Sequence, residues 1–151
     1  KFEAKAEGTI GDLPLAVIVN RNTSSGAEIL AAALQDHRRA TIVGERTFGR
    51  GIVQRIVPLE STGGAIRLTS AVYTRPTGQP LKRERVNGVP KEGDEIGGVS
   101  PDAGFAIELS EDELRQYYEY RQERDFPTPG ATGQLEFTDR ALEKALEAVR
   151  Q

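Results

Sequence analysis

The chain has 151 residues, of which 37% are hydrophobic and 28% are charged, and its formal net charge is −3. This length predicts a single globular domain, and the small negative charge argues against a broad nucleic-acid-binding surface. With no cysteine and one histidine, His37, the chain has no disulfides, no thiolate metal site and no cysteine nucleophile. We therefore expect no metal, no cofactor and no nucleic-acid partner.

The first 45 residues predict a strand–helix–strand unit. Residues 1–12 are polar and are predicted to form a loop, and the apolar run Leu15–Val19 predicts a strand buried on both faces of a sheet. After a polar turn, a helix is expected to carry one apolar face, made of Ile29, Leu30, Ala33 and Leu34. Residues 41–44 then read as a second strand, which completes a βαβ unit.

The middle of the chain predicts a hairpin and a long loop. Residues 51–59 and 65–74 are rich in β-branched side chains and flank a Ser-Thr-Gly-Gly turn, so they are predicted to pair as a hairpin. Residues 79–104 are rich in glycine, proline and charge, which predicts an extended surface loop. A short strand is expected at 105–109.

The C-terminal part predicts two helices. Ser110 and Glu113 have the spacing of a capping box, so a helix is expected from about 111 to 124. The Pro-Thr-Pro-Gly segment at 127–130 ends it. Thr138 is predicted to cap a last helix with one apolar face, made of Ala141, Leu142, Ala145, Leu146 and Val149.

The turn between the first strand and the first helix is the most chemically suggestive segment. Ser25 lies at the start of the helix, where free backbone amides and the helix dipole would stabilise an oxyanion, so it could be an acyl-transfer nucleophile. Ser25 and Glu28 also have the spacing of a capping box, and a helix cap needs no catalytic role. From this turn alone, capping is the simpler interpretation.

Longer motifs connect the chain to a known family. Between Pro14 and Tyr73 the informative segments are Val19-Asn20, Glu28-Ile29, Ala33-Leu34-Gln35-Asp36-His37, Val43 through Gly49, Gly51, Val53-Gln54 and Arg67-Leu68-Thr69. In these segments the sequence resembles the carboxyl-terminal processing proteases, also called tail-specific proteases, which are serine–lysine peptidases. Two further segments, Tyr73–Gly78 and Gly98–Asp102, resemble the family's Tyr-Thr-Pro-Ser-Gly and Gly-Ile-x-Pro-Asp signatures.

The resemblance implies roles for individual residues. The family's nucleophile corresponds to Ser25, and the backbone amide that forms half of its oxyanion hole corresponds to Gly26. A glutamine that assists the general base corresponds to Gln54. The general base itself is a lysine between two glycines, and at that position this chain has Arg50.

Arginine at this position is unsuited to act as a base. A guanidinium has donors and no acceptor, and its deprotonation near pH 7 would cost on the order of 7 kcal/mol or more. His37 is a poor substitute, because it lies about 12 residues, or roughly 18 Å, along the helix from Ser25. Two explanations of Arg50 stay open: drift in a chain with 15 arginines and 5 lysines, and a pseudoenzyme.

The resemblance also implies a fold and partners. We expect an α/β fold of the ClpP/crotonase-like type, with a mixed sheet, packed helices and a C-terminal helical tail. Residues 1–110 would be the C-terminal half of a peptidase catalytic domain and 111–151 a helical appendage. The chain has no methionine, and we expect it to be a piece of a longer protein, whose N-terminal half or peptide-binding PDZ domain would be a partner.

Two functions follow from these expectations. One is a serine endopeptidase that cuts proteins near their C-terminal tails, with weak or absent activity because of Arg50. The other is an inactive module that binds peptide tails. A homodimer is expected, since half of a catalytic domain would leave a strand edge and an apolar face uncovered, and the family implies a periplasmic or otherwise exported location.

Overall fold

The computed structural model describes residues 11–60, 63–91, 96–126 and 137–150. The predicted loop at 1–10, the hairpin tip at 61–62 and the helix break at 127–130 lie outside these ranges. Three helices and six strands are present in the described residues, in the order β1 (Ala16–Val19), α1 (Gly26–Asp36), β2 (Thr41–Gly44), β3 (Ile52–Pro58), β4 (Ala65–Val72), β5 (Arg85–Val86), β6 (Val89–Pro90), α2 (Glu111–Asp125) and α3 (Arg140–Arg150). The fold is therefore mixed α/β, as predicted, but the described strands form three separate two-stranded sheets, one parallel and two antiparallel, and not the predicted mixed sheet.

The predicted βαβ unit is confirmed, but the predicted apolar face of its helix is wrong at Leu30, which is 61% exposed, whereas Ala31 and Ala32 are buried. β1 and β2 pair in parallel, with Ala16 opposite Thr41 and Val19 opposite Gly44, and α1 connects them. The core cluster around this unit consists of Val19, Ala31, Ala32, Ile42, Leu81 and Val99. Gly44 is required at the end of β2, because its φ is +118° and a Cβ there would lie 2.0 Å from the carbonyl oxygen of Val19.

The prediction that β1 is buried on both faces is wrong. Val19 is buried, but the next side chain back, Ile18, is 41% exposed. Within the described residues this sheet has two strands, and side chains alternate between its faces. α3 packs against β1 and β2 and leaves Ile18 partly open to solvent.

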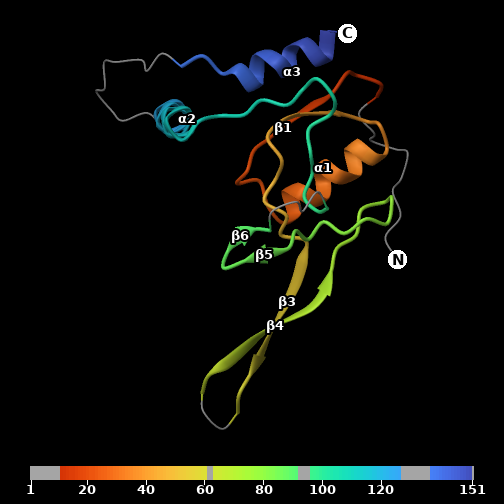
Figure 1. Ribbon diagram of the computed structural model, residues 1–151, viewed down its shortest axis with the longest axis vertical. Helices are drawn as coiled ribbons and strands as arrows, with labels where there is room; N and C mark the ends of the chain where they lie inside the picture. Colours follow the sequence, from red (N-terminus) through yellow and green to blue (C-terminus); the bar gives the residue numbers. More distant parts are fainter. Residues whose placement is uncertain (1–10, 61–62, 92–95, 127–136, 151) are drawn as a thin grey trace.

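The predicted hairpin is formed by β3 and β4, which project away from the helices (Figure 1). The strands pair antiparallel from Ile52 opposite Val72 to Pro58 opposite Ala65, with a bulge between Val53 and Gln54. Large apolar side chains on it are exposed: Ile56, Val57, Ile66, Leu68 and Val72. An isolated two-stranded hairpin has only one partner per strand and gains little from burial.

The segment 79–104 is more than the predicted surface loop. Leu81 is 1% exposed and Val99 is fully buried, so both join the core. Between them, β5 and β6 form a small hairpin. Because glycine, proline and charged residues dominate the composition of this segment, its sequence pattern does not reveal that Leu81 and Val99 are core residues.

The predicted strand at 105–109 is reduced to a single bridge. Gly44 donates its amide to Phe105 and accepts the amide of Ile107, and the only pairing recorded for the segment in the described residues is Gly44 with Ala106. β2 ends at Gly44, so no strand continues beside the segment. The amide of Leu109 instead donates to the Glu45 carboxylate at 3.1 Å.

The two C-terminal helices are confirmed, with one change of cap. In α2, Ser110 and Glu113 form the predicted capping box. In α3, the Asp139 carboxylate accepts the amide of Leu142 at 2.9 Å, so the cap is Asp139 and not Thr138. The apolar face of α3 is half covered: Ala145 is buried, whereas Leu142 and Leu146 are 43% and 42% exposed.

Candidate active site

Ser25 begins α1 in a strained backbone conformation. Its φ is 58° and its ψ is −122°, a combination that costs a residue with a Cβ of the order of 1–3 kcal/mol. An ordinary capping serine has extended backbone angles, as Ser110 does with φ −62° and ψ 163°. Ser25 and Glu28 form the predicted capping box, but no full side-chain cap hydrogen bond is made, unlike at Ser110, whose hydroxyl accepts the Glu113 amide at 3.2 Å.

Glu28 holds this conformation from inside the protein. Its side chain is fully buried, and its carboxylate accepts four hydrogen bonds. Oε1 accepts the Thr47 hydroxyl at 2.5 Å and the Gly49 amide at 2.6 Å. Oε2 accepts the amides of Ser25 at 2.9 Å and Arg50 at 2.8 Å. One carboxylate thus joins the serine turn to the loop that carries Arg50.

The loop at 47–50 is fixed at every backbone amide. Besides the two amides bound by Glu28, Thr47 donates to the Val99 carbonyl at 3.0 Å and Phe48 to the Thr23 carbonyl at 2.9 Å. The Thr47 hydroxyl, which donates to Glu28, also accepts the Val99 amide at 2.8 Å. The loop therefore cannot shift without breaking several buried hydrogen bonds.

The amide of Gly26 is free to bind an anion. In the described part of the chain it has no hydrogen-bond partner, and Gly26 is exposed at the first position of α1. A helix N-terminus with an open amide favours negative charge. Sequence reasoning assigns Gly26 to an oxyanion hole, and its free amide beside Ser25 suits that prediction.

Arg50 and Gln54 are exposed residues with different surroundings. The Arg50 guanidinium lies 4.8 Å from the centre of the Phe48 ring, while its backbone amide binds Glu28. Gln54 lies in β3 opposite Thr69, just after the bulge. Its side chain makes no hydrogen bond among the described residues, so its role as helper stays a prediction.

Sequence reasoning treated Glu28 as a capping residue and part of a motif, and missed its role as the connection between the two loops. The available signal was an acidic side chain followed directly by the apolar face of a helix. Glu28 precedes Ile29, Ala31 and Ala32, which pack in the core. A carboxylate on that face needs buried donors, and those donors could not be named from spacing alone.

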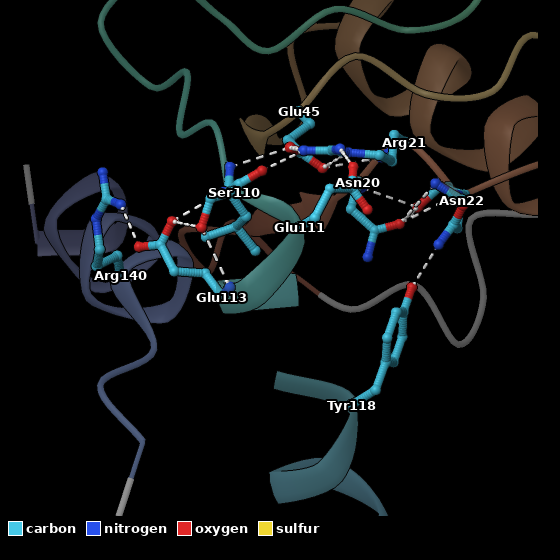
Figure 2. A network of polar contacts seen from close by, with 11 residues as sticks. Asn20, Arg21, Asn22, Glu45, Ser110, Glu111, Glu113, Tyr118 and Arg140 are labelled. Atoms are coloured by element: carbon cyan, nitrogen blue, oxygen red, sulfur yellow. Dashed lines mark hydrogen bonds and ion pairs between the residues drawn. The ribbon is translucent and has the colours of Figure 1, made fainter. Parts of the chain in front are cut away.

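A second network holds the beginning of the serine turn (Figure 2). The Arg21 guanidinium binds Glu45 at 2.5 Å and Glu111 at 2.6 Å, and it also donates to the Leu109 carbonyl. The Asn22 side-chain amide donates to the Tyr118 hydroxyl at 2.7 Å. Helix α2 is therefore tied to the turn that leads to Ser25.

The Glu45 carboxyl group should make the free energy of unfolding depend on pH. Burial raises the pKa of this carboxyl, but the bonds from Arg21 and from the amides of Leu109 and Arg21 hold the pKa below its ordinary value overall. A group with a lowered folded pKa stabilises the protein above its unfolded pKa of about 4.3 and loses that contribution as the pH falls through the folded pKa.

We expect Glu45→Gln to lower the free energy of unfolding at pH 7 by about 1 kcal/mol, because the Arg21 pair is partly exposed. Urea unfolding from pH 7 to pH 3 should then show a smaller loss of stability in the variant than in the native protein. Glu119→Gln, on the exposed side of α2, is the control and should keep the native pH dependence. Equal acid sensitivity of the native protein and Glu45→Gln would contradict the assignment.

His37 lies away from Ser25. His37 is exposed at the C-terminal end of α1, at the opposite end from Ser25. Among the described residues, no three histidine, cysteine, aspartate or glutamate side chains come together as a metal site. In the same ranges, no helix has the length and apolar character needed to cross a membrane.

Comparison with known proteins decides the family. The model of the family described as "Peptidase family S41" matches residues 1–102. The chain belongs to peptidase family S41. The matched range contains Ser25, Glu28, Arg50 and Gln54, whereas α2 and α3 follow its end.

Curated relatives in this family share parts of the chain. It is 38% identical to the carboxy-terminal-processing protease of Bartonella bacilliformis, an alignment that covers 83% of this chain and 28% of the relative. It is 51% identical to the carboxyl-terminal-processing protease of Synechocystis sp., covering 50% of this chain and 17% of the relative. The chain thus spans less than a third of the length of these two relatives.

One solved structure is also similar to part of the chain. The photosystem II D1 C-terminal processing protease shares 40% sequence identity, with a TM-score of 0.49, over 63% of this chain and 20% of that chain.

Proposed function

We propose that this S41 chain carries the reactive serine of a peptidase that cuts proteins near their C-terminal tails, with Ser25 as the nucleophile. The observation that carries the proposal is the strained, exposed Ser25 at the start of α1. A cap would not need that strain, since Ser110 caps α2 with ordinary angles. Strained backbone at a strand-to-helix turn is how hydrolases expose a nucleophilic hydroxyl. The names of the relatives support the tail-processing part.

The chemistry assigns one step to each group. The Ser25 oxygen bonds to the carbonyl carbon of the scissile peptide, and the carbonyl electron pair moves to its oxygen. The amide of Gly26 donates to that oxyanion. The C–N bond then breaks, and the leaving amine needs the proton that the Ser25 hydroxyl gives up. Glu28 acts as a positioning residue, because it holds the backbone of Ser25 without touching the substrate.

The proton transfer is the weak point of this mechanism. A lysine amine at position 50 could accept the serine proton once neutral, but the Arg50 guanidinium has no acceptor. Gln54 is assigned to orient the group at position 50. We therefore expect slow peptide hydrolysis.

A second function is favoured by Arg50 itself. Its guanidinium is exposed and has no carboxylate partner among the described residues. The Arg50 backbone amide shares the Glu28 carboxylate with that of Ser25, so its side chain starts near an open helix N-terminus, and a cation there suits a terminal carboxylate. A chain that binds peptide tails without cutting them is the alternative.

The fold and location are part of the same proposal. A ClpP/crotonase-like arrangement would place the β1–α1–β2 unit in a larger mixed sheet, which the rest of a longer S41 protein would complete. An exported location is supported by relatives whose names carry the word chloroplastic, such as that of Tetradesmus obliquus.

A fluorophosphonate probe tests the assignment of Ser25. The probe needs a nucleophilic hydroxyl and an oxyanion hole, so slow but saturable labelling is expected, with the adduct on Ser25 by mass spectrometry. Ser25→Ala should abolish the labelling, and Ser24→Ala, one residue earlier, should keep most of it. Labelling that persists in Ser25→Ala would refute the nucleophile.

A further inference from the structure

An open groove of about 480 Å³ begins at Arg50 and runs between the loop at 48–52 and the segment 82–91. Cationic side chains dominate its charged lining, which consists of Arg50, Lys82, Arg83, Arg85, Lys91 and a single acid, Glu84. The chain as a whole has a net charge of −3. The groove therefore has the opposite sign of charge from the protein that contains it.

Most of this positive charge is not neutralised within the described residues. Lys91 pairs with Glu84 at 3.4 Å, but Arg50, Lys82, Arg83 and Arg85 form no ion pair there. Like charges gathered in one groove repel each other and destabilise the folded chain. An anionic ligand would remove that cost.

The arginines are held in place by groups that leave their charge intact. Arg85 donates to the carbonyls of Phe48 at 2.7 Å and Gly88 at 2.8 Å, and its guanidinium lies 3.7 Å from the centre of the Phe48 ring. Carbonyls and an aromatic ring orient a cation without neutralising it. Arg85 is thus preorganised, which reduces the entropy lost when a ligand binds.

Arg83 is positioned through Gly49. A Cβ at position 49 would lie 2.3 Å from Cγ of Arg83, so the arginine stem passes directly over the glycine. The Arg83 guanidinium reaches the Thr47 carbonyl at 3.5 Å, and the Nε atoms of both Arg83 and Arg85 are buried without an acceptor among the described residues. The loop at 47–50, which Glu28 binds, therefore also positions the Arg83 side chain that lines the groove.

The groove and the serine turn meet at Arg50. The backbone amides of Arg50 and Ser25 donate to the same oxygen of Glu28, so their nitrogens are no farther apart than two hydrogen-bond lengths. A peptide whose scissile bond lies at Ser25 would have neighbouring residues within reach of the groove.

We propose that this groove binds carboxylates of the peptide substrate, so that the protein prefers acidic segments next to the cleavage point. The inference rests on the proposed peptidase function and adds a substrate class to it. Guanidinium groups pair with carboxylates in a bidentate geometry. Phe48, Ile52 and Val86 supply apolar surface between the cations, which suits a polypeptide, and the negative net charge disfavours nucleic acid.

Peptide binding tests the proposal in a Ser25→Ala background, where the ligand is not cut. The probes are two fluorescent peptides that differ only in glutamate or glutamine at matched positions, each with a free or an amidated C-terminus. Because several ion pairs would form in the groove, we expect the glutamate peptide to bind about tenfold more tightly than the glutamine peptide. This difference in affinity should decrease as the ionic strength rises. If affinity depends on glutamate against glutamine, the groove binds side-chain carboxylates. If affinity depends on a free against an amidated C-terminus, the groove binds the terminal carboxylate.

Charge variants locate the binding. Lys82→Glu should weaken binding of the glutamate peptide about tenfold and leave the glutamine peptide unchanged, and Arg83→Gln should act in the same direction. Arg67→Glu makes the same charge change as Lys82→Glu on the exposed hairpin and should have less than about a twofold effect. If Arg67→Glu weakened binding of the glutamate peptide as much as Lys82→Glu, the groove would not be the binding site. Equal affinity of the protein for all four peptides would also refute the proposal.

The result also separates the groove from the peptidase function. Saturable labelling of Ser25 by the fluorophosphonate probe, together with equal affinity for the glutamate and glutamine peptides, would refute the groove and leave the peptidase assignment intact. Selective binding of acidic peptides by a protein whose Ser25 never reacts with the probe would leave the groove and refute the peptidase.

Discussion

Replacing Glu28 with glutamine should lower the free energy of unfolding by about 3 kcal/mol, because a buried carboxylate with four donors cannot be matched by an amide. The glutamine NH₂ group would face either the Thr47 and Gly49 donors or the Ser25 and Arg50 amides. At least one pair of donors would then lose its acceptor inside the protein.

The same substitution should slow the reaction of Ser25 with the fluorophosphonate probe by at least about tenfold, since small displacements of a reacting group are costly. Urea unfolding and the labelling rate measure the two effects. Glu143→Gln is the matched control, because Glu143 also lies in the first turn of a helix but is exposed. If Glu28→Gln behaved like Glu143→Gln, Glu28 would not be the connection between the two loops.

Replacing Arg50 with lysine should raise the rate of tailed-peptide hydrolysis by about 10²-fold or more, which is what a positioned general base contributes. The Arg50 backbone is held by Glu28 whatever its side chain, so a lysine would start from the same position. Its amine, once neutral, could accept the proton from Ser25.

Arg55→Lys is the control for this gain, because Arg55 is an exposed arginine in the neighbouring strand β3. It should leave hydrolysis at the native rate. The gain should also vanish in the double variant Ser25→Ala with Arg50→Lys. An unchanged rate in Arg50→Lys would mean that the guanidinium is not what limits hydrolysis.

The sequence alone predicts the helices and strands whose residues carry their own hydrophobic or capping pattern. The apolar run before Asn20 and the helical spacing after Gly26 specify β1 and α1, and the capping box at Ser110 specifies the start of α2. Asp139 shows the limit of such reasoning. Thr138 and Asp139 are both good caps, and only the geometry of the Leu142 amide selects the second.

Features that depend on distant contacts were missed. Leu81 and Val99 enter the core because the backbone of this segment hydrogen-bonds to Gly49, Tyr73 and Thr47, and composition does not reveal these bonds. The segment 105–109 has strand-like residues, but β2 ends beside it at Gly44. Pairing depends on a neighbour as well as on propensity.

The candidate site divides in the same way. Ser25 and Arg50 could be singled out from motifs, because their residue types determine their chemistry. The role of Glu28 depends on three donors about twenty residues away in the chain, and the groove depends on arginines that a loop of mixed composition brings beside Phe48. Both become visible only when the loops are placed together.

Hydrolysis of a peptide with a free C-terminal tail by the native protein tests the central claim most directly, namely that Ser25 is a held nucleophile without a base at position 50. The predicted result is slow hydrolysis, with a rate only slightly above that of Ser25→Ala over the same period. Rapid cleavage by the native protein that is lost in Ser25→Ala would contradict the account, because a proton acceptor other than Arg50 would then have to serve Ser25.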